Sequence, residues 1–225
     1  DLGLEIGLER LPFVQKRIIK ESRHAGKPVI LATQVLNSMV NNPIPTRAEA
    51  TDIVNAIIEG VDAILLTDET AEGKYPVEAI QYLDKIITYA EARIRNNRPK
   101  PRDEIDDAIA LAIVEIAEIA NAKLIFVHSR TGSSIMRVSR FRPRVDIIGL
   151  CKSEQIAKRL KLCYGVTPLL LKKELKNLNQ IVSFCERFYR RKFRKTGRIV
   201  IAGGDPRSKE GKTDFIKLHE INTES

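Results

Sequence analysis

The sequence is poor in the residues that build disulfide, zinc or redox sites. It has 225 residues with no tryptophan, and aromatic residues make up only 5% of it. Its three cysteines, Cys151, Cys163 and Cys185, are odd in number and far apart. The sequence therefore predicts neither a disulfide framework nor a CxxC metal or redox motif, and a reducing environment fits best.

Long apolar runs are also missing. The longest, such as DAILLT and KLIFV, are far too short to cross a bilayer, and the sequence does not open with a basic segment followed by an apolar one. We therefore expect no membrane contact and no secretion, and we predict a cytoplasmic protein. His24, His128 and His219 stand alone, without partners at the spacing of metal ligands.

Positive charge is in excess. The formal net charge is +9 and the pI is near 9.5, which favours an anionic partner such as a nucleic acid or a phosphorylated metabolite, or simply aids solubility. The densest basic stretch contains Arg187, Arg190, Arg191, Lys192, Arg194, Lys195 and Arg198. Ile181, Phe184, Cys185 and Phe188 share one helical face there, so we interpret the basic residues as the solvated outer face of a helix and expect no nucleic-acid partner.

The first part of the sequence alternates between strand and helix patterns. Pro12 and Gly26 bracket a helix, and KPVILAT follows as a strand. Thr46 and Glu49 form a capping box that opens a second helix, which Gly60 ends. VDAILLT is the next strand, TDETAEGK a polar loop and YPVEAIQYLDKIITYAEARI a helix. Continuous apolar strands between helices indicate parallel strands that are buried on both faces.

A linker and a second domain follow. Residues 96–103, NNRPKPRD, are polar and twice interrupted by proline, so they separate a domain at residues 1–95 from one at residues 104–225. The second domain alternates helix and strand from IDDAIALAIVEIAEIA to RIVIAGG. A short loop leads to TDFIKLHEI, which we expect to lie antiparallel at or near the sheet edge. The prediction is a mostly parallel, helix-flanked sheet.

Polar residues stand where the strands of the first domain end. These are Asp1, Thr33 with Gln34, and the run Thr67–Thr70. In parallel α/β domains such positions meet at one rim, and a carboxylate there suits Mg²⁺. The alternative is a terminal aspartate beside threonines that only cap helices, and spacing alone favours that alternative.

Three stretches of the first domain resemble pyruvate kinases. They are DLGLEI, AGKPVILATQVLNSMVNNPIPTRAEATD and DAILLTDETAEGKYPVEA, and SRFRPRVDIIGL and GKTDFIKLH extend the similarity more loosely. The resemblance implies that residues 1–95 are the last part of a catalytic (β/α)8 barrel and that residues 104–225 are the allosteric C-terminal domain of that family. It also implies phosphoryl transfer from phosphoenolpyruvate to ADP, giving pyruvate and ATP in glycolysis.

The resemblance assigns roles to residues of the first domain. Asp1 matches the ligand of the divalent metal, Mg²⁺ or Mn²⁺, and Asp1, Leu2 and Gly3 match the loop beside the substrate carboxylate. Thr33 matches a substrate-binding residue that takes part in protonating the enolate, and Thr67 matches a serine hydroxyl of the same proton relay. A further match is Arg47, an arginine that supports the active site near the subunit interface.

Two departures and one absence qualify this assignment. Asp68 stands where the family has glycine, which predicts backbone strain and repulsion of phosphate, and Ile44 replaces an arginine. The family's phosphate-binding lysine, its second metal carboxylate, its nucleotide and K⁺ sites and its lid domain precede a segment such as this one. We therefore expect residues 1–225 alone to be inactive, and limited proteolysis to cut first within residues 1–103 and leave a core that begins near Asp103.

The second domain has one candidate binding loop, between KLIFVH and SSIMRVSRF. It comprises Ser129, Arg130, Thr131, Gly132, Ser133 and Ser134. Hydroxyls, free amides and a helix N-terminus suit a phosphate group, although an ordinary capped turn is as common. The resemblance implies an allosteric sugar phosphate or nucleoside monophosphate here, covered by residues 203–212 with Arg207, Lys209 and Lys212 as anion contacts.

Three functions remain open at this stage. The first is part of a pyruvate kinase, in the family a homo-oligomer and commonly a tetramer. The second is a stand-alone regulatory module that binds a phosphorylated metabolite or a partner without catalysis. The third and least favoured is a nucleic-acid module, which would require a steep dependence of affinity on salt.

Overall fold

A computed structural model describes residues 2–94, 98–204 and 213–222 of the chain. Contacts divide the chain into two compact units, Asp1–Asn97 and Arg98–Ser225. Each unit is described by itself below. In the described ranges, no helix combines the length and the apolar character that a bilayer span requires.

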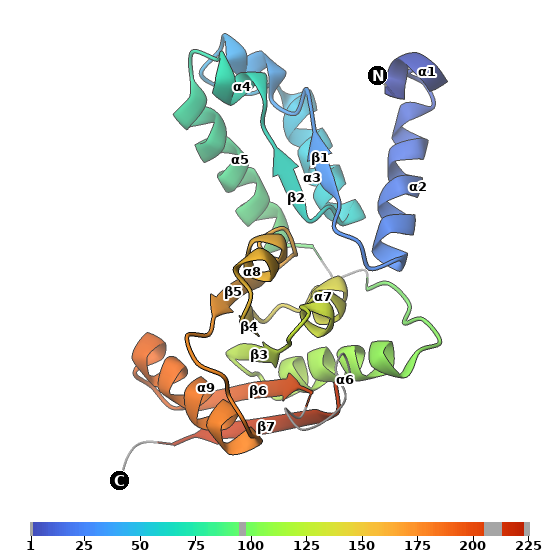
Figure 1. Cartoon of the computed structure of the whole chain (residues 1–225). Helices are drawn as coiled ribbons and strands as arrows, with labels where there is room; N and C mark the ends of the chain where they lie inside the picture. Colours follow the sequence, from blue (N-terminus) through green and yellow to red (C-terminus); the bar gives the residue numbers. More distant parts are fainter. Residues whose placement is uncertain (1, 95–97, 205–212, 223–225) are drawn as a thin grey trace. The chain divides into compact units, whose positions relative to one another are not determined.

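The first unit holds one pair of strands with helices around it (Figure 1). In chain order its elements are α1 (Leu2–Ile6), α2 (Leu11–His24), β1 (Ile30–Ala32), the 3-10 helix η1 (Asn37–Val40), α3 (Arg47–Glu59), β2 (Ala63–Leu65), α4 (Asp68–Ala71) and α5 (Pro76–Glu91). β1 and β2 pair in parallel, with Ala32 opposite Leu65. This confirms the predicted strand–helix–strand unit with its crossover helix.

Local sequence signals explain where α3 begins and ends. The Thr46 hydroxyl accepts the Glu49 N–H at 3.3 Å, and the Glu49 carboxylate accepts the Thr46 N–H at 2.7 Å, which completes the predicted capping box. Gly60 then ends the helix in the left-handed conformation, at φ 104°. Ile53 and Ile57 of the helix are buried with Leu36 in the core of the unit. The capping residues and the buried apolar residues therefore define the same helix.

Two segments of the first unit differ from the sequence prediction. TDETAEGK was predicted as a polar loop, but Asp68–Ala71 form the short helix α4. Asp68 and Glu69 lie in its first turn, where carboxylates favour a helix N-terminus. The residues after Asp1 form the helix α1 rather than a strand end and loop. The prediction missed both helices because each is too short to show a hydrophobic period.

The strands of the first unit are less covered than predicted. The sequence predicted strands that are buried on both faces, but none of the three residues in either β1 or β2 is fully buried. Ile30 is 45% exposed and Leu65 is 51% exposed. Each strand has one partner strand among the described residues, so its other edge and part of its apolar surface stay uncovered.

The second unit is a five-stranded sheet in the order β5-β4-β3-β6-β7. Its elements are α6 (Ile105–Ile119), β3 (Leu124–His128), α7 (Ser133–Arg140), β4 (Ile147–Cys151), α8 (Glu154–Leu160), β5 (Val166–Leu170), α9 (Leu178–Phe193), β6 (Gly197–Gly203) and β7 (Phe215–Ile221). The first four strands of this order are parallel, and β7 pairs antiparallel with β6 at the edge. This confirms the predicted mixed sheet and its antiparallel edge strand.

Alternating strand residues serve two cores on the two faces of this sheet. Ile125 and Val127 belong to the core that α6, α7 and α8 cover. Leu124 and Phe126 belong to the core beneath α9. The period of two in a strand produces this division, and both β3 and β4 are buried along their whole length.

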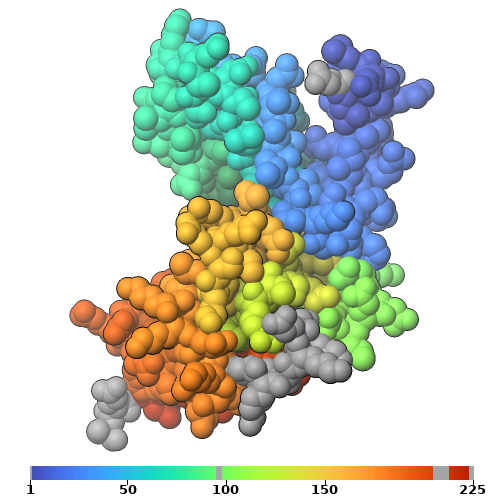
Figure 2. All heavy atoms as spheres, viewed as in Figure 1, coloured from blue at the N-terminus to red at the C-terminus, as the bar shows by residue number. Residues whose placement is uncertain are grey.

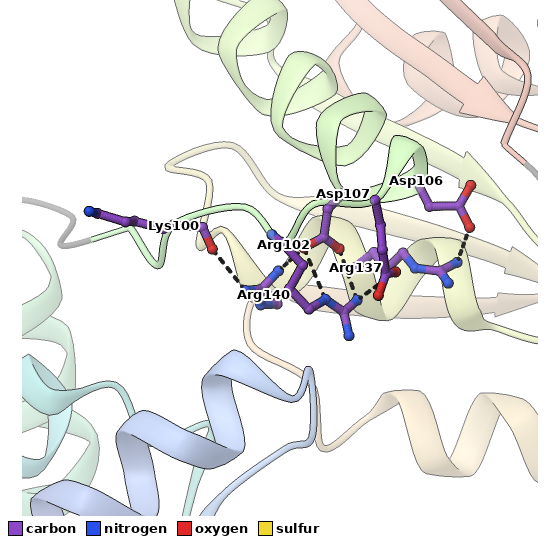
Figure 3. Close-up of polar contacts among 7 residues, drawn as sticks. Lys100, Arg102, Asp106, Asp107, Arg137 and Arg140 are labelled. Carbon is purple, nitrogen blue, oxygen red and sulfur yellow. Dashed lines mark hydrogen bonds and ion pairs between the residues drawn. The ribbon is translucent and has the colours of Figure 1, made fainter.

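Hydrogen bonds and ion pairs hold the charged segment before α6 against α6 and α7 (Figure 3). Asp107, which is fully buried, accepts the Arg102 backbone N–H at 2.8 Å and two guanidinium N–H groups of the same residue at 3.1 and 2.9 Å. Arg140 of α7 also donates to Asp107, and it donates to the Lys100 carbonyl at 3.0 Å. Burial alone would raise the pKa of Asp107, but these hydrogen bonds and the two positive charges lower it to about 2.

Candidate functional site

Thr33 and Thr67 lie just beyond the carboxyl ends of two neighbouring parallel strands. Thr33 follows the last residue of β1 directly, and Thr67 comes two residues after the last residue of β2. The register pairs Ala32 with Leu65, so both threonines leave the same end of the strand pair. This is the side of a parallel sheet at which ligands usually bind.

The backbone at the end of β1 is strained. Thr33 has φ 69° and Gln34 has φ 55°, both in the left-handed region. For a β-branched residue such as threonine this conformation is uncommon and costs on the order of 1–3 kcal/mol. Thr33 is exposed, and its hydroxyl donates to the Ala32 carbonyl at 2.6 Å. The fold thus holds an exposed hydroxyl at the strand end in spite of that cost.

Glu69 connects the loops that follow the two strands. Its side chain is buried, and one carboxylate oxygen accepts the Leu36 N–H at 2.8 Å while the other accepts the Thr67 N–H at 2.9 Å. The sequence reasoning missed this role. The available signal was a carboxylate two residues after a strand-end threonine, but its bond to Leu36 spans 33 positions and leaves no local pattern.

The departure at Asp68 has a different consequence from the predicted one. Asp68 was expected to strain a tight loop, but it lies in the first turn of α4 and is absent from the residues with positive φ. The close approach falls instead at Gly73, where a Cβ would lie 2.3 Å from the Glu69 carbonyl oxygen. The prediction of backbone strain at Asp68 is therefore wrong, and the position that requires glycine is Gly73, five residues later. Ile44, the other departure, is 59% exposed.

The remaining predicted residues of the first unit are less informative. Asp1 lies outside the described residues. Leu2 and Gly3 are the first two residues of α1. Arg47 is the first residue of α3, and its side chain is exposed. Across residues 2–94, 98–204 and 213–222, no group of three or more His, Cys, Asp or Glu side chains could hold a metal ion.

The candidate loop of the second unit joins β3 to α7 and has a defined conformation. The Ser129 hydroxyl accepts the Gly132 N–H at 3.0 Å, and the Thr131 and Ser133 hydroxyls lie 2.9 Å apart. Gly132 has φ 85°, and a Cβ on it would lie 2.9 Å from Ile156 of α8. Only glycine therefore fits between this loop and the neighbouring helix.

The hydroxyl groups of this loop divide into internal and accessible ones. The Ser134 hydroxyl is buried and accepts a hydrogen bond from Thr213 at 2.7 Å, so it joins the loop to the start of the β7 segment. Ser129 is also buried, whereas Arg130 and Thr131 are exposed and Ser133 is half-buried. Three of the six residues that the sequence predicted for this loop are therefore accessible to a ligand. Lys212, with Arg207 and Lys209, lies outside the described residues.

His128 is the last residue of β3, immediately before this loop. It is 8% exposed, and its burial lowers the pKa of the imidazole, an effect that the Arg130 charge reinforces. The ring is therefore neutral near pH 7 and adds no charge to the loop. Positive charge close to the accessible hydroxyls comes from Arg130 and from Arg159, which donates to the Thr131 carbonyl at 3.1 Å.

Two protein-family models match the chain. The model described as pyruvate kinase, barrel domain, matches residues 1–80. The model described as pyruvate kinase, alpha/beta domain, matches residues 107–219. These two ranges follow the division of the structure into a first unit with the strand pair and a second unit with the five-stranded sheet.

Curated relatives match the chain over nearly its full length. A pyruvate kinase of Thermotoga maritima is 41% identical over 224 residues, which cover 99% of the chain and 48% of that protein. A pyruvate kinase of Methylorubrum extorquens is 35% identical over 232 aligned residues, and one of Clostridium acetobutylicum is 36% identical over 228. The chain spans about half the length of these curated relatives, 48% in each case.

Proposed function

Because the chain belongs to the pyruvate kinase family, we propose that it is part of an enzyme that transfers a phosphoryl group from phosphoenolpyruvate to ADP. The products are pyruvate and ATP, as in glycolysis. In this proposal the first unit supplies part of the catalytic barrel and the second unit is the C-terminal allosteric domain, with the boundary in the segment 96–103.

The observation that best supports this proposal is the strained, exposed Thr33 at the end of β1. Its hydroxyl would border the enolate that remains once the phosphoryl group has left, and Thr67 on the neighbouring strand would supply the second hydroxyl of the proton relay. To donate to the substrate, the Thr33 hydroxyl must turn away from the Ala32 carbonyl. While the Thr33 hydroxyl turns, the hydrogen bonds of Glu69 to Leu36 and Thr67 hold the loops after β1 and β2 in place.

The metal ions belong to the proposal as well. The described residues do not by themselves supply a set of metal ligands, and the expected ligand, Asp1, lies outside them. We assign Mg²⁺ or Mn²⁺ to Asp1 together with a carboxylate from another part of the protein, and K⁺ wholly to another part. A divalent ion in such a site supplies charge stabilisation for the transferred phosphoryl group.

The surface of the first unit supports its being one part of a larger barrel. Large apolar side chains are exposed on α1, α2 and α5 and on both strands. Leu4 of α1 is 89% exposed, and Phe13 of α2 is 76% exposed. Exposed apolar surface of this kind marks a face that other protein covers. The rest of a (β/α)8 barrel, with six further strands, is the cover that the family match predicts.

For the second unit we propose a regulatory role. The loop Ser129–Ser134 would bind the phosphate of a sugar phosphate or a nucleoside monophosphate through Arg130, Thr131, Ser133 and the first amides of α7, with Lys212 closing over it. A homo-oligomer, commonly a tetramer in the family, with Arg47 near a subunit interface, completes the proposal. We expect the protein to act in the cytoplasm without nucleic-acid partners.

The alternative of a stand-alone regulatory module is not favoured, because pyruvate kinases match the chain across both units. The discriminating experiment is a coupled assay of pyruvate release from phosphoenolpyruvate and ADP with Mg²⁺ and K⁺. The whole protein that contains this chain should turn over at roughly 1–100 per second, and purified residues 1–225 should show no activity. An inactive whole protein would contradict the proposal, and an active isolated chain would contradict the assignment of the missing groups.

A further inference from the structure

The second unit has a pocket that the proposed catalytic and regulatory roles do not use. Its volume is about 870 Å³, and it lies where the chain leaves the carboxyl end of β5 and turns into α9. This part of the chain is drawn in orange in Figure 2, on the surface of the second unit. In an open parallel sheet the crevice beyond the strand ends is the usual place for a ligand.

The floor of this pocket is apolar. Leu169, Leu171, Leu175 and Phe184 line it, and all four belong to the core beneath α9 or pack against it. Their inner sides are therefore held by the core, while their outer sides face the pocket. A floor of this composition accommodates a flat hydrocarbon body, and Phe184 offers it an aromatic ring.

The rim of the pocket is positively charged. Lys172, Lys173 and Arg187 line it and are exposed, and no hydrogen bond or ion pair is assigned to their side chains within the described parts of the chain. Of the described residues in the lining, Glu174 is the one carboxylate, and it is paired with Lys152 at 3.2 Å. Among the residues that the structure describes, these three cations thus lie over an apolar floor without a neutralising partner.

We propose that this pocket binds an aromatic organic anion, with its ring system on the leucine and phenylalanine floor and its carboxylate or phosphate at Lys172, Lys173 and Arg187. The charge complementarity and the apolar floor each select against other ligands. Inorganic phosphate lacks the body that the floor buries, and a neutral aromatic compound lacks the group that the cations recognise. The pocket shares no residue with the strand-end rim or with the loop Ser129–Ser134, so the proposal does not depend on either.

The test is a titration of the full 225-residue chain, labelled with ¹⁵N, against three probes followed by amide chemical shifts. The probes are 2-naphthoate, the neutral 2-naphthalenemethanol and inorganic phosphate. We expect 2-naphthoate to move the amides of residues 169–187 in a saturable manner, and each of the other two probes to bind at least about tenfold more weakly. Equal binding of the acid and the alcohol, or shifts centred outside this segment, would overturn the proposal.

Matched variants separate recognition by charge from general attraction. The double variant Lys172→Glu/Lys173→Glu should weaken 2-naphthoate binding about tenfold or more, whereas Lys176→Glu, on the same connection but outside the pocket lining, should leave the affinity unchanged. Equal losses in both variants would overturn the proposal. A further variant, Ser183→Trp, fills the pocket and tests whether the pocket is instead a contact between copies of the chain. If this variant abolishes self-association in sedimentation experiments, and 2-naphthoate does not bind the unaltered chain, the proposal is wrong.

Discussion

Glu69 is the residue on which the geometry of the strand ends depends. Replacing it with glutamine keeps the shape but gives one of its two positions an N–H₂ group, which faces a backbone N–H donor. A buried donor left unsatisfied costs about 1–3 kcal/mol. We therefore expect Glu69→Gln to accelerate hydrogen exchange at the amides of Leu36 and Thr67 by roughly tenfold or more. In the whole enzyme it should also reduce activity.

The matched control for this change is Glu72→Gln. Glu72 is exposed and ends the same short helix, so its loss should leave the exchange of those two amides unchanged. Unaltered exchange in Glu69→Gln would show that the loops hold their positions without the carboxylate.

Asp107 makes the stability of the second unit depend on acid. Its pKa is about 2 in the folded chain and near 3.8 in the unfolded chain, so its contribution is complete above pH 3.8 and is lost as the pH falls through 2. The difference corresponds to about 2 kcal/mol. We expect Asp107→Asn to lower the free energy of unfolding at pH 7 and to flatten its decline between pH 5 and pH 2, as measured by urea denaturation.

Asp103→Asn is the control for this pH dependence, because Asp103 is exposed and precedes the same helix. It should follow the wild-type curve. If the Asp107→Asn and wild-type curves remain parallel over the whole range, the ion pairs with Arg102 and Arg140 do not set the acid sensitivity.

The loop before α7 makes a prediction at the level of an element. A phosphorylated ligand at about 100 times its Kd stabilises its domain by about 2.7 kcal/mol, so a binding member of a panel of sugar phosphates and nucleoside monophosphates should raise the melting temperature of the second unit. Ser133→Asp places negative charge at the helix N-terminus among the accessible hydroxyls and should remove this shift. Asn121→Asp, an equal charge change at the exposed turn before β3, should preserve it. If no member of the panel produces a shift, the loop is only a structural turn.

The sequence predicts a helix or strand well where the pattern that indicates it lies within a few neighbouring residues. The capping box of α3 and the apolar period of α9 each involve neighbouring residues, and the structure confirms them, as it confirms the antiparallel pairing of β7 with β6. α4 was missed because four residues cannot show a helical period. α9 begins at Leu178, directly after its cap at Asn177, whose side chain accepts the Gln180 N–H.

The candidate site was predictable only in part for the same reason. Thr33 and Thr67 follow apolar strands, so their places at the strand ends could be inferred from the sequence. The positive φ of Thr33 could not, because strain is a property of the assembled fold. The bridge through Glu69 joins positions far apart in the chain, and no periodicity encodes such a contact.

At the scale of the whole chain, the two units should differ in resistance to proteolysis. The first unit has two short strands with exposed apolar residues, while the second has a five-stranded sheet with both faces covered. We expect limited trypsin digestion to cut first within the first unit. The segment from Arg98 to Arg102 is bonded to the second unit, so the surviving core should begin nearer Arg98 than Asp103.

Mass spectrometry of the surviving fragment identifies its first residue. A fragment that retains the first unit intact in a monomeric sample would show that the strand pair and its helices are stable without further barrel strands.

The central claim is that hydroxyls at the strand ends protonate an enolate, and deuterium incorporation into the methyl group of pyruvate tests it most directly. The whole protein should catalyse this exchange in D₂O with Mg²⁺ and K⁺, as followed by proton NMR. Thr33→Ala should slow the exchange by about 10²-fold or more, the usual contribution of a positioned proton donor. Thr51→Ala, the same change at an exposed site on α3, should exchange at the wild-type rate. Exchange at the wild-type rate in Thr33→Ala would contradict the claim.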